Sequence, residues 1–266
     1  MNKCTSLVIV GSGIKFLSHL TTETKSYILQ ADIVLYLVND TAMKNWIAQN
    51  NSNTESLDFL YEKFPLRLDC YTAITDYILS TLKKGQHVCV VLYGHPSHFS
   101  IPALNAARKA KQDGFDTKIL PGISAEDCLI SDLYIDTGTC GCQSFETTDF
   151  LINRRIFDPT SHLLLWQVDV IGALNHAHHH DNKKGIEFLV NKLIPHYNEN
   201  HEVVLYEASQ YPFLEPRIER IKLSNLDKAS LTPITTLYIP PMQQRMYDSV
   251  IAKELGINLN ELEKRL

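Results

Sequence analysis

The sequence predicts an α/β protein with a mostly parallel sheet in its first half. Four short apolar runs have the length of buried strands and lie at residues 6–10, 31–37, 87–93 and 117–120. Helical patterns separate these runs, at residues 24–29, 71–82 and 101–113. The second helical pattern is regular, because apolar and aromatic residues recur at steps of three and four from Tyr71 to Leu82, and Gly85 closes it. Strands that alternate with helices in this way form parallel sheets.

The second half repeats the alternation less regularly. Its expected strands cover residues 162–167, 202–207 and 234–239, and its expected helix covers residues 186–194. The Pro121-Gly122 pair breaks regular structure between the halves. We therefore predict an N-terminal α/β domain at 1–121, a C-terminal α/β domain at 122–242 and a helical tail at 243–266.

Composition narrows the class of protein. The chain has 266 residues, of which 44% are hydrophobic and 21% charged, as is typical of a soluble globular protein. Its formal net charge of −5 disfavours a general nucleic-acid binder, which needs a basic face. No window approaches about 18 consecutive apolar residues, and the N-terminus lacks the apolar stretch of a signal peptide. We expect no membrane span and a cytoplasmic location.

The cysteines and histidines do not predict a metal site. Cys140 and Cys142 form a C-x-C pair, but no second pair follows at a zinc-site spacing. A polar segment carries a histidine cluster, made of His176, His178, His179 and His180. The cluster has no carboxylate or cysteine partner at a motif-like spacing, so a solvated loop is the favoured interpretation.

Glycine-containing turns follow three of the predicted strands. Gly11-Ser12-Gly13 lacks the third small residue of a dinucleotide fingerprint, because Phe16 stands there, so a plain tight turn is favoured. The segments 93–96 (YGHP) and 121–125 (PGISA) lie where ligands bind in open parallel sheets, beyond the carboxyl ends of strands. Each is also consistent with a structural loop.

A phenol and guanidinium set stands before and within the second predicted helix. Tyr61, Arg67 and Tyr71 lie within eleven residues. If the helix begins near Asp69, Tyr71 lies in its first turn and Arg67 on the loop that enters it. The alternative is an exposed arginine with two half-buried tyrosines.

The order of these segments resembles the tetrapyrrole-methylase superfamily over nearly the whole chain to about Pro241. The segments are GSG (11–13), ADIVLY (31–36), YGHP (93–96), PGISA (121–125), PRIERI (216–221) and ITTLYIPP (234–241). YGHP, the tyrosine–arginine segment, HLLLWQ (162–167) and EVVLYEA (202–208) resemble the peptide-backbone α-N-methyltransferases of borosin biosynthesis. The chain ends at Leu266 without an extended core-peptide-like tail. It therefore looks like the split type, which methylates a separate precursor peptide of a RiPP (a ribosomally made, modified peptide).

This resemblance implies a two-domain tetrapyrrole-methylase fold that binds S-adenosylmethionine in the interdomain cleft and releases S-adenosylhomocysteine. The implied donor-binding residues are Tyr93, His95, Phe99, Ser100, Ser124, Ala125, Gln167, Tyr206, Thr235 and Thr236. His98 replaces the small residue often found two positions after YGHP, which puts the loop contacts in doubt. The family also implies a homodimer, often interlocked, that forms a heterotetramer with two peptides.

The chemistry assigns hypothetical roles to the phenol and guanidinium groups. An amide nitrogen is a poor nucleophile, because its lone pair is delocalised into the carbonyl. It needs a proton acceptor near N–H and a positive or hydrogen-bonding group at the oxygen. We assign the proton acceptor to Tyr71 and expect Arg67 to lower its pKa and stabilise the imidate oxygen. Tyr61 and Tyr93 would orient substrate or donor, and no metal is required.

Three other functions remain open at this point. A corrin-type tetrapyrrole methylase shares the fold and donor but calls for a basic cleft. A ribosomal-RNA ribose methylase is disfavoured by the acidic net charge. A non-catalytic peptide-binding module would bind the donor without turnover.

Overall fold

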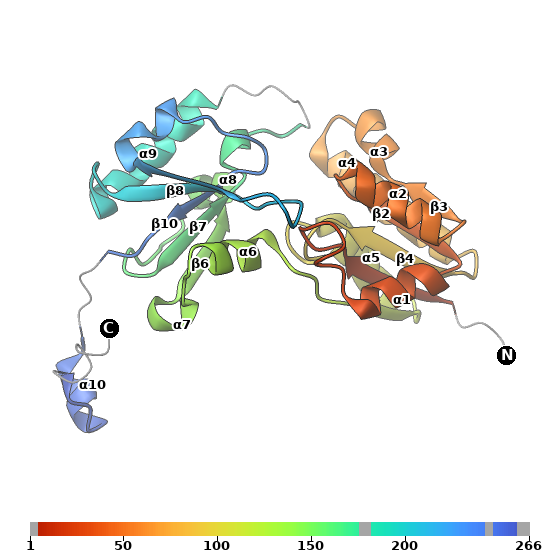
Figure 1. The fold of residues 1–266 in the computed structure, drawn as a ribbon, viewed down its shortest axis with the longest axis horizontal. Coiled ribbons are helices and arrows are strands. Elements are labelled where there is room, and N and C mark those ends of the chain that lie inside the picture. The colour runs from red at the N-terminus through yellow and green to blue at the C-terminus, as the bar shows by residue number, and fades with distance from the viewer. Residues whose placement is uncertain (1–4, 176–181, 243–246, 260–266) are drawn as a thin grey trace.

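The computed structural model describes residues 5–175, 182–242 and 247–259, and it contains two five-stranded sheets (Figure 1). We call the part built on the first sheet, residues 5–119, the N-terminal lobe. The part built on the second sheet, residues 125–239, is the C-terminal lobe. The domain boundaries proposed from the sequence stay a prediction.

The N-terminal sheet has the order β3-β2-β4-β1-β5, and every pair in it is parallel. Its strands are β1 (Ser6–Gly11), β2 (Ile33–Leu37), β3 (Thr54–Ser56), β4 (His87–Leu92) and β5 (Asp116–Ile119). Its helices are α1 (Thr22–Gln30), α2 (Thr41–Asn50), α3 (Asp58–Lys63), α4 (Arg67–Leu82) and α5 (Ile101–Gln112). The predicted mostly parallel sheet is confirmed, whereas α2, β3 and α3 were not predicted.

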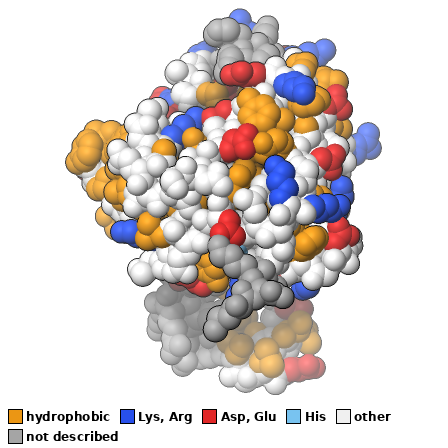
Figure 2. Space-filling view, turned by 90° about the vertical axis from the view of Figure 1, so that its right-hand side faces the viewer, with side chains coloured by type: hydrophobic (Ala, Val, Ile, Leu, Met, Phe, Trp, Pro, Cys, Tyr) orange, Lys and Arg blue, Asp and Glu red, His pale blue; other side chains and the backbone are white. Residues whose placement is uncertain are grey.

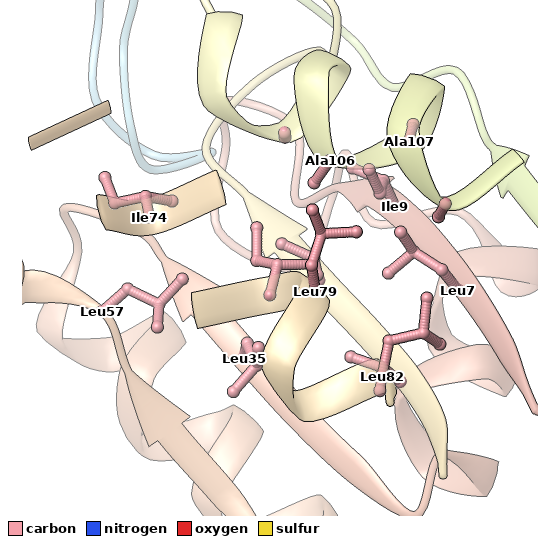
Figure 3. Close-up of a cluster of buried hydrophobic side chains, with 14 of the residues drawn as sticks. Leu7, Ile9, Leu35, Leu57, Ile74, Leu79, Leu82, Ala106 and Ala107 are labelled. Carbon is pink, nitrogen blue, oxygen red and sulfur yellow. The ribbon is translucent and has the colours of Figure 1, made fainter. Parts of the chain in front are cut away.

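Both faces of this sheet are covered, because successive side chains of a strand point to opposite faces. On one face Leu7 and Ile9 belong to a buried cluster with Leu79 and other residues of α4 and α5 (Figure 3). On the other face Val8 and Val10 pack with residues of α1 and α2. This two-sided burial explains why β1, β2 and β4 read as continuous apolar runs.

The C-terminal sheet has the order β6-β7-β10-β8-β9, in which only the β6–β7 pair is parallel. Its strands are β6 (Cys142–Glu146), β7 (His162–Trp166), β8 (Glu202–Glu207), β9 (Arg217–Lys222) and β10 (Thr236–Ile239). The accompanying helices are α6 (Ala125–Asp132), α7 (Thr137–Cys140), α8 (Thr147–Ile152) and α9 (Lys183–Tyr197), with 3-10 turns at Val168–Val170 and Leu223–Lys228. The predicted strands and helix of this half are present, and β6, β9 and α6–α8 are additional.

One apolar cluster joins the lobes. Leu164 and Trp166 of β7 face away from α9 and share this cluster with Tyr206 of β8. Ile14 and Tyr93 of the N-terminal lobe pack into the same cluster. The loops at the carboxyl ends of β1 and β4 therefore rest on the C-terminal sheet.

Hydrogen bonds also link the lobes. The Arg67 backbone N–H donates to the carbonyl of Leu174 at 3.1 Å, at the start of α4. On the β8–β9 connection, the Tyr211 hydroxyl donates to the Asp40 carboxylate at 2.6 Å, and Asp40 also caps α2. These links tie the C-terminal lobe to two different helices of the N-terminal lobe.

Three glycines allow the backbones to meet where β1 and β4 end. A Cβ atom on Gly11 would lie 2.1 Å from the carbonyl oxygen of Gly94, and one on Gly122 would lie 2.8 Å from that oxygen. Gly94 itself has a φ of +70°. Any side chain at Gly11 would push these segments apart.

Part of the predicted tail and the histidine cluster fall outside the described residues. Within 247–259 the tail forms α10 (Ser249–Glu254), which lies apart from both sheets (Figure 1). His176, His178, His179 and His180 lie in the undescribed segment 176–181. Across the described ranges, no helix has the length and apolar character needed to cross a membrane.

Replacing Gly11 with alanine should destabilise the protein strongly. The new methyl group would overlap the Gly94 carbonyl, so we expect a loss of at least about 3 kcal/mol in unfolding free energy. Gly114→Ala is the control, because Gly114 has a φ of +85° but nothing within 4 Å of a Cβ. Gly114→Ala should lose only about 1–2 kcal/mol of unfolding free energy, which comes from backbone strain. Equal losses in denaturant unfolding would contradict the steric explanation.

Candidate active site

Three cavities adjoin one another between the lobes. The tyrosine cavity, of about 610 Å³, is lined by Tyr61, Tyr71 and Tyr93 among others. The threonine cavity, of about 230 Å³, is lined by residues that include Thr235 and Thr236. The outer cavity, of about 590 Å³, has walls that include Leu66, Leu68 and Leu174.

Phe99 and Gln167 line all three cavities and mark their junction. Phe99 lies between β4 and α5, and Gln167 follows β7, so each lobe contributes one of the two residues. Both have left-handed backbones, with φ values of +50° and +58°. Non-glycine residues in this region cost on the order of 1–3 kcal/mol, and such strain concentrates at functional sites. The junction is therefore a strained point held by both lobes.

Most of the predicted donor-binding residues line the threonine cavity. Those that do are Tyr93, His95, Phe99, Ser124, Ala125, Gln167, Thr235 and Thr236. Ser100 lines the tyrosine cavity instead. Tyr206 lies behind the cavity walls: its side chain is fully buried, and its hydroxyl donates to Asp132 at 2.7 Å. On β8 it points to the same face as Val204, within the cluster that joins the lobes.

The Ser124 hydroxyl is already engaged within the protein. It accepts from the Asp127 backbone N–H and donates to the Asp127 carboxylate. The Ser124 backbone N–H also donates to that carboxylate, which completes a capping box at the start of α6. Ser124 therefore shapes the cavity by starting a helix at its edge.

The Thr235 hydroxyl belongs to a network centred on Glu207. One carboxylate oxygen of Glu207 accepts from Thr235 at 2.5 Å, from Thr232 at 2.8 Å and from Arg217 at 2.7 Å. Burial raises the pKa of Glu207, but the bonds from the two threonines and Arg217 outweigh it, so the net pKa is lowered. The network fixes the wall of the threonine cavity.

Glu207 was not among the predicted site residues. Its partner Arg217 faces it directly, because β8 and β9 are antiparallel and these two residues are paired in register. The local signal is weak: Glu207 directly follows the apolar run VVLY, and only Arg217-Ile218-Glu219 shows the alternation of a half-exposed strand.

Helix α4 begins at Arg67, four residues before the predicted helical pattern of 71–82 and two before the start near Asp69 that was considered above. A long-range contact supports this start, because Leu66 forms an isolated bridge with Asn175 and Arg67 Nε donates to the Asn175 carbonyl at 3.2 Å. Arg67 and Tyr71 therefore lie one turn apart on the same face of the helix. Arg67 lines the outer cavity, and Tyr71 lines both this cavity and the tyrosine cavity.

Burial dominates the acidity of the phenols. It raises the pKa of Tyr71, and the Arg67 charge acts in the opposite direction but is the smaller effect. Burial also raises the pKa of Tyr61 far above its usual range and that of Tyr93 to about 12. Arg67 acts to lower the pKa of Tyr71, as expected, but burial has the larger effect. The net pKa of Tyr71 is therefore above its ordinary value.

Aromatic rings surround the junction. The Trp166 ring lies 5.9 Å from that of Phe99 and 6.4 Å from that of His98, between ring centroids. His98 is exposed and lines both the tyrosine and the threonine cavities. Burial lowers the pKa of the neighbouring His95, which favours a neutral imidazole. The residue that departs from the family pattern therefore lies next to the junction, in the walls of two of the three cavities.

The charged residues that line the cavities are mostly acidic. Asp58 and Glu62 line the tyrosine cavity, and Asp69 and Glu146 line the outer cavity. Arg67 is the cation among these lining residues. On the face of the molecule shown in Figure 2, charges of both signs are interspersed. Within the described ranges, no group of three or more His, Cys, Asp or Glu is placed to hold a metal ion.

Comparison with protein families and curated proteins gives concordant matches. The family model "Tetrapyrrole (Corrin/Porphyrin) Methylases" matches residues 6–227. A methyltransferase/type I borosin cyclic peptide precursor of Coprinopsis marcescibilis is 37% identical over 245 residues, or 90% of this chain and 63% of the relative. A methyltransferase/lentinulin A precursor of Lentinula edodes is 37% identical over 261 residues, or 96% and 62%. The chain thus spans less than two thirds of the length of these relatives.

Solved structures share the fold. Cobalt precorrin-4 methyltransferase superposes with a TM-score of 0.61 at 16% identity, covering 89% of this chain and 95% of that one. Uroporphyrin-III-C-methyltransferase of Thermus thermophilus gives 0.60 at 18% identity, with 89% and 92% covered. The predicted family resemblance and fold are confirmed.

Neutralising Glu207 should remove a pH-dependent part of the stability. Its folded pKa lies below the ordinary 4.5, so its stabilisation is present above that pH and is lost as pH falls through the folded pKa. Glu207→Gln should cost about 1–2 kcal/mol of unfolding free energy near pH 7, and the gap to the native protein should shrink in acid. Glu202→Gln, on the same strand in an exposed pair with Arg220, is the control and should leave no such gap. A gap that does not change with pH would contradict the assignment.

Proposed function

This chain belongs to the tetrapyrrole (corrin/porphyrin) methylases, and from that premise we propose that it transfers a methyl group from S-adenosylmethionine to backbone amides of a peptide. The observation that carries the proposal is the Arg67–Tyr71 pair. The two residues line the tyrosine and outer cavities, which share Phe99 and Gln167 with the threonine cavity.

The threonine cavity suits the donor chemically. A bound donor supplies an electrophilic methyl group on a positively charged sulfur. Tyr93, Phe99 and Trp166 offer aromatic faces, which attract cations, and none of the lining residues is a carboxylate or a basic lysine or arginine. The threonine and tyrosine cavities share Tyr93, Phe99 and Gln167 in their walls, which supports transfer from one to the other.

The acceptor is assigned from the relatives and from charge. The relatives at 37% identity are named as methyltransferases and as precursors of cyclic peptides, in one case a type I borosin peptide. The alternative acceptor, a tetrapyrrole, carries several carboxylates. The lining carboxylates Asp58, Glu62, Asp69 and Glu146 would repel such a macrocycle, whereas a neutral peptide backbone is compatible with them.

In this proposal, the residues of the chain have separate roles at one amide group of the peptide. Arg67 approaches the carbonyl oxygen and stabilises its negative charge as the amide becomes imidate-like. Tyr71, as the phenolate, takes the proton from the amide nitrogen. The nitrogen forms a bond to the methyl carbon while the carbon–sulfur bond breaks, which leaves a neutral thioether. Tyr61 and Tyr93 hold the amide in line for attack, which is worth on the order of 7–11 kcal/mol in favourable cases.

The proposal also covers the route by which the peptide enters and the oligomeric state of the enzyme. We propose that the precursor peptide enters in trans through the outer cavity, whose exposed leucines Leu66, Leu68 and Leu174 lie on the path from solvent. We also propose a homodimer that takes two peptides, as the family resemblance implies. Both are tested by adding peptide to the purified chain and measuring the mass of the complex.

Substituting the phenol or the guanidinium should slow methyl transfer strongly without abolishing donor binding. With a synthetic peptide added in trans, Tyr71→Phe and Arg67→Ala should each lower the methylation rate by about 100-fold or more. Tandem mass spectrometry locates methyl groups on backbone nitrogens, and calorimetry measures the uptake of S-adenosylhomocysteine.

The control for the phenol is Tyr77→Phe. Tyr77 is on the same helix, but its hydroxyl donates to Glu55 at 2.6 Å, away from the cavities. It should keep near-native methylation. Near-native rates in Tyr71→Phe would refute its role as proton acceptor, and donor uptake with no methylated peptide would favour a non-catalytic binding module.

The rate should rise with pH. Because burial raises the pKa of Tyr71, the phenol is mostly protonated near neutrality, and its basic form increases as pH rises toward that pKa. Arg67→Ala removes the charge that lowers the pKa of Tyr71, so the methylation rate of this variant should rise at higher pH than that of the native protein. Arg67→Lys keeps a positive charge and should reverse part of this shift. Single-turnover rates from about pH 6 to about pH 9.5 measure this. Identical profiles in native protein and Arg67→Ala would show that the two groups are not coupled.

A further inference from the structure

The tyrosine cavity extends into the core of the N-terminal lobe as an apolar recess. Its floor and walls are formed by Leu57, Ile74, Ile78, Val90, Leu92 and Ala103, all at most 7% exposed. They come from β4, α4, α5 and the residue before α3. Leu57 and Ile74 stand at one end of the buried cluster in Figure 3. The recess is thus a space left where this core ends.

The carboxylates and Asn39 in the lining of the tyrosine cavity reach solvent. Asn39 and Glu62 are exposed, and the Asp58 carboxylate is half-exposed and paired with Lys44 at 2.5 Å. The floor residues carry no side-chain hydrogen-bonding group that a polar ligand could use. A polar group placed on this floor would lose its water without gaining a partner.

The position of Tyr71 restricts what can occupy the recess. If Tyr71 contacts the amide nitrogen, the α-carbon of the same peptide residue is one bond away. The side chain on that α-carbon therefore begins next to the tyrosines. The threonine cavity is assigned to the donor, and the outer cavity must carry the peptide in and out. Ser124, Thr235 and Thr236 are absent from the lining of the tyrosine cavity. Of the three cavities, only the recess of the tyrosine cavity is then available for the side chain of the acceptor residue.

We propose that the recess binds the side chain of the residue whose amide nitrogen is methylated, and that Ala103 sets the largest side chain accepted. The proposal rests on the peptide-methylation function above. The ligand is an uncharged apolar side chain. Ala103 is the residue that limits size because it stands on α5, which packs against α4, where Ile74 and Ile78 form the facing wall. A larger residue there would fill the recess.

The test uses peptides that differ only at the acceptor residue, with Gly, Ala, Val, Leu, Phe or Asn at that position. In Ala103→Leu, kcat/KM for the Leu peptide should fall by about 10-fold or more relative to the Gly peptide, because the added methylenes occupy the same space. In the native protein, the Asn peptide should be methylated more slowly than the Leu peptide of similar size, since its amide would be unpaired.

Two further variants keep the proposal falsifiable. Ile78→Ala enlarges the floor and should raise the relative rate for a Phe acceptor, even if Ala103→Leu folds poorly. Ala107→Val is the matched control, because Ala107 is a buried alanine on the same helix that is absent from the cavity lining. It should leave the ratio of Leu to Gly acceptors unchanged.

The outcomes separate the two proposals. If the native protein methylates none of the peptides, the proposed function fails. If it methylates them but Ala103→Leu and Ile78→Ala leave the acceptor ratios unchanged, the recess proposal is overturned. It is also overturned if Ala103→Leu weakens S-adenosylhomocysteine binding while the ratios stay constant, because the recess would then belong to the donor.

Discussion

The site depends on the close approach of three backbones at Gly11, Gly94 and Gly122. Because no side chain separates them, the segments that follow β1, β4 and β5 leave the sheet at one point. The loop after β4 then carries Tyr93 to Ser100 along the cavities, and the segment after Gly122 starts α6 at Ser124. A parallel sheet places these loops at one edge, and the glycines bring them into contact. The C-terminal lobe supplies the opposite wall through Gln167 and the network of Glu207.

The chemistry follows from a competition between burial and charge. Burial raises the pKa of Tyr71, while the guanidinium of Arg67 opposes it. In the proposed reaction, a positively charged donor in the adjacent cavity adds to the effect of Arg67, so Tyr71 becomes a base only where a donor can accept the attack. The same burial excludes water from the nucleophile. The neutral threonine cavity and the predominantly acidic outer walls therefore suit a cationic donor and an uncharged acceptor.

Local pattern accounts for most of the fold that could be predicted. The apolar runs of β1, β2 and β4 are buried on both faces, and the spacing from Tyr71 to Leu82 matches a single helix face. Strand β9 was not predicted because four of its six residues are charged, so it resembles an exposed segment until it pairs with β8. The start of α4 was misplaced because it depends on Asn175, which is 108 residues away from Arg67. Such long-range pairings leave no local signal.

The residues of the candidate site were likewise predictable only in part. Residues that belong to contiguous motifs, such as His95 and Ser124, could be matched by resemblance, and most line one cavity. Tyr206 reads equally well as a ligand-binding residue, and only the alternation of β8 shows that it points into the cluster behind the wall. Arg67 shows the larger constraint. Tyr71 is on the same helix, but the Arg67 side chain is oriented by a carbonyl of the C-terminal lobe. Any movement between the lobes therefore alters the charge next to the proposed base, so the fit of the two lobes and the acidity of Tyr71 are set together.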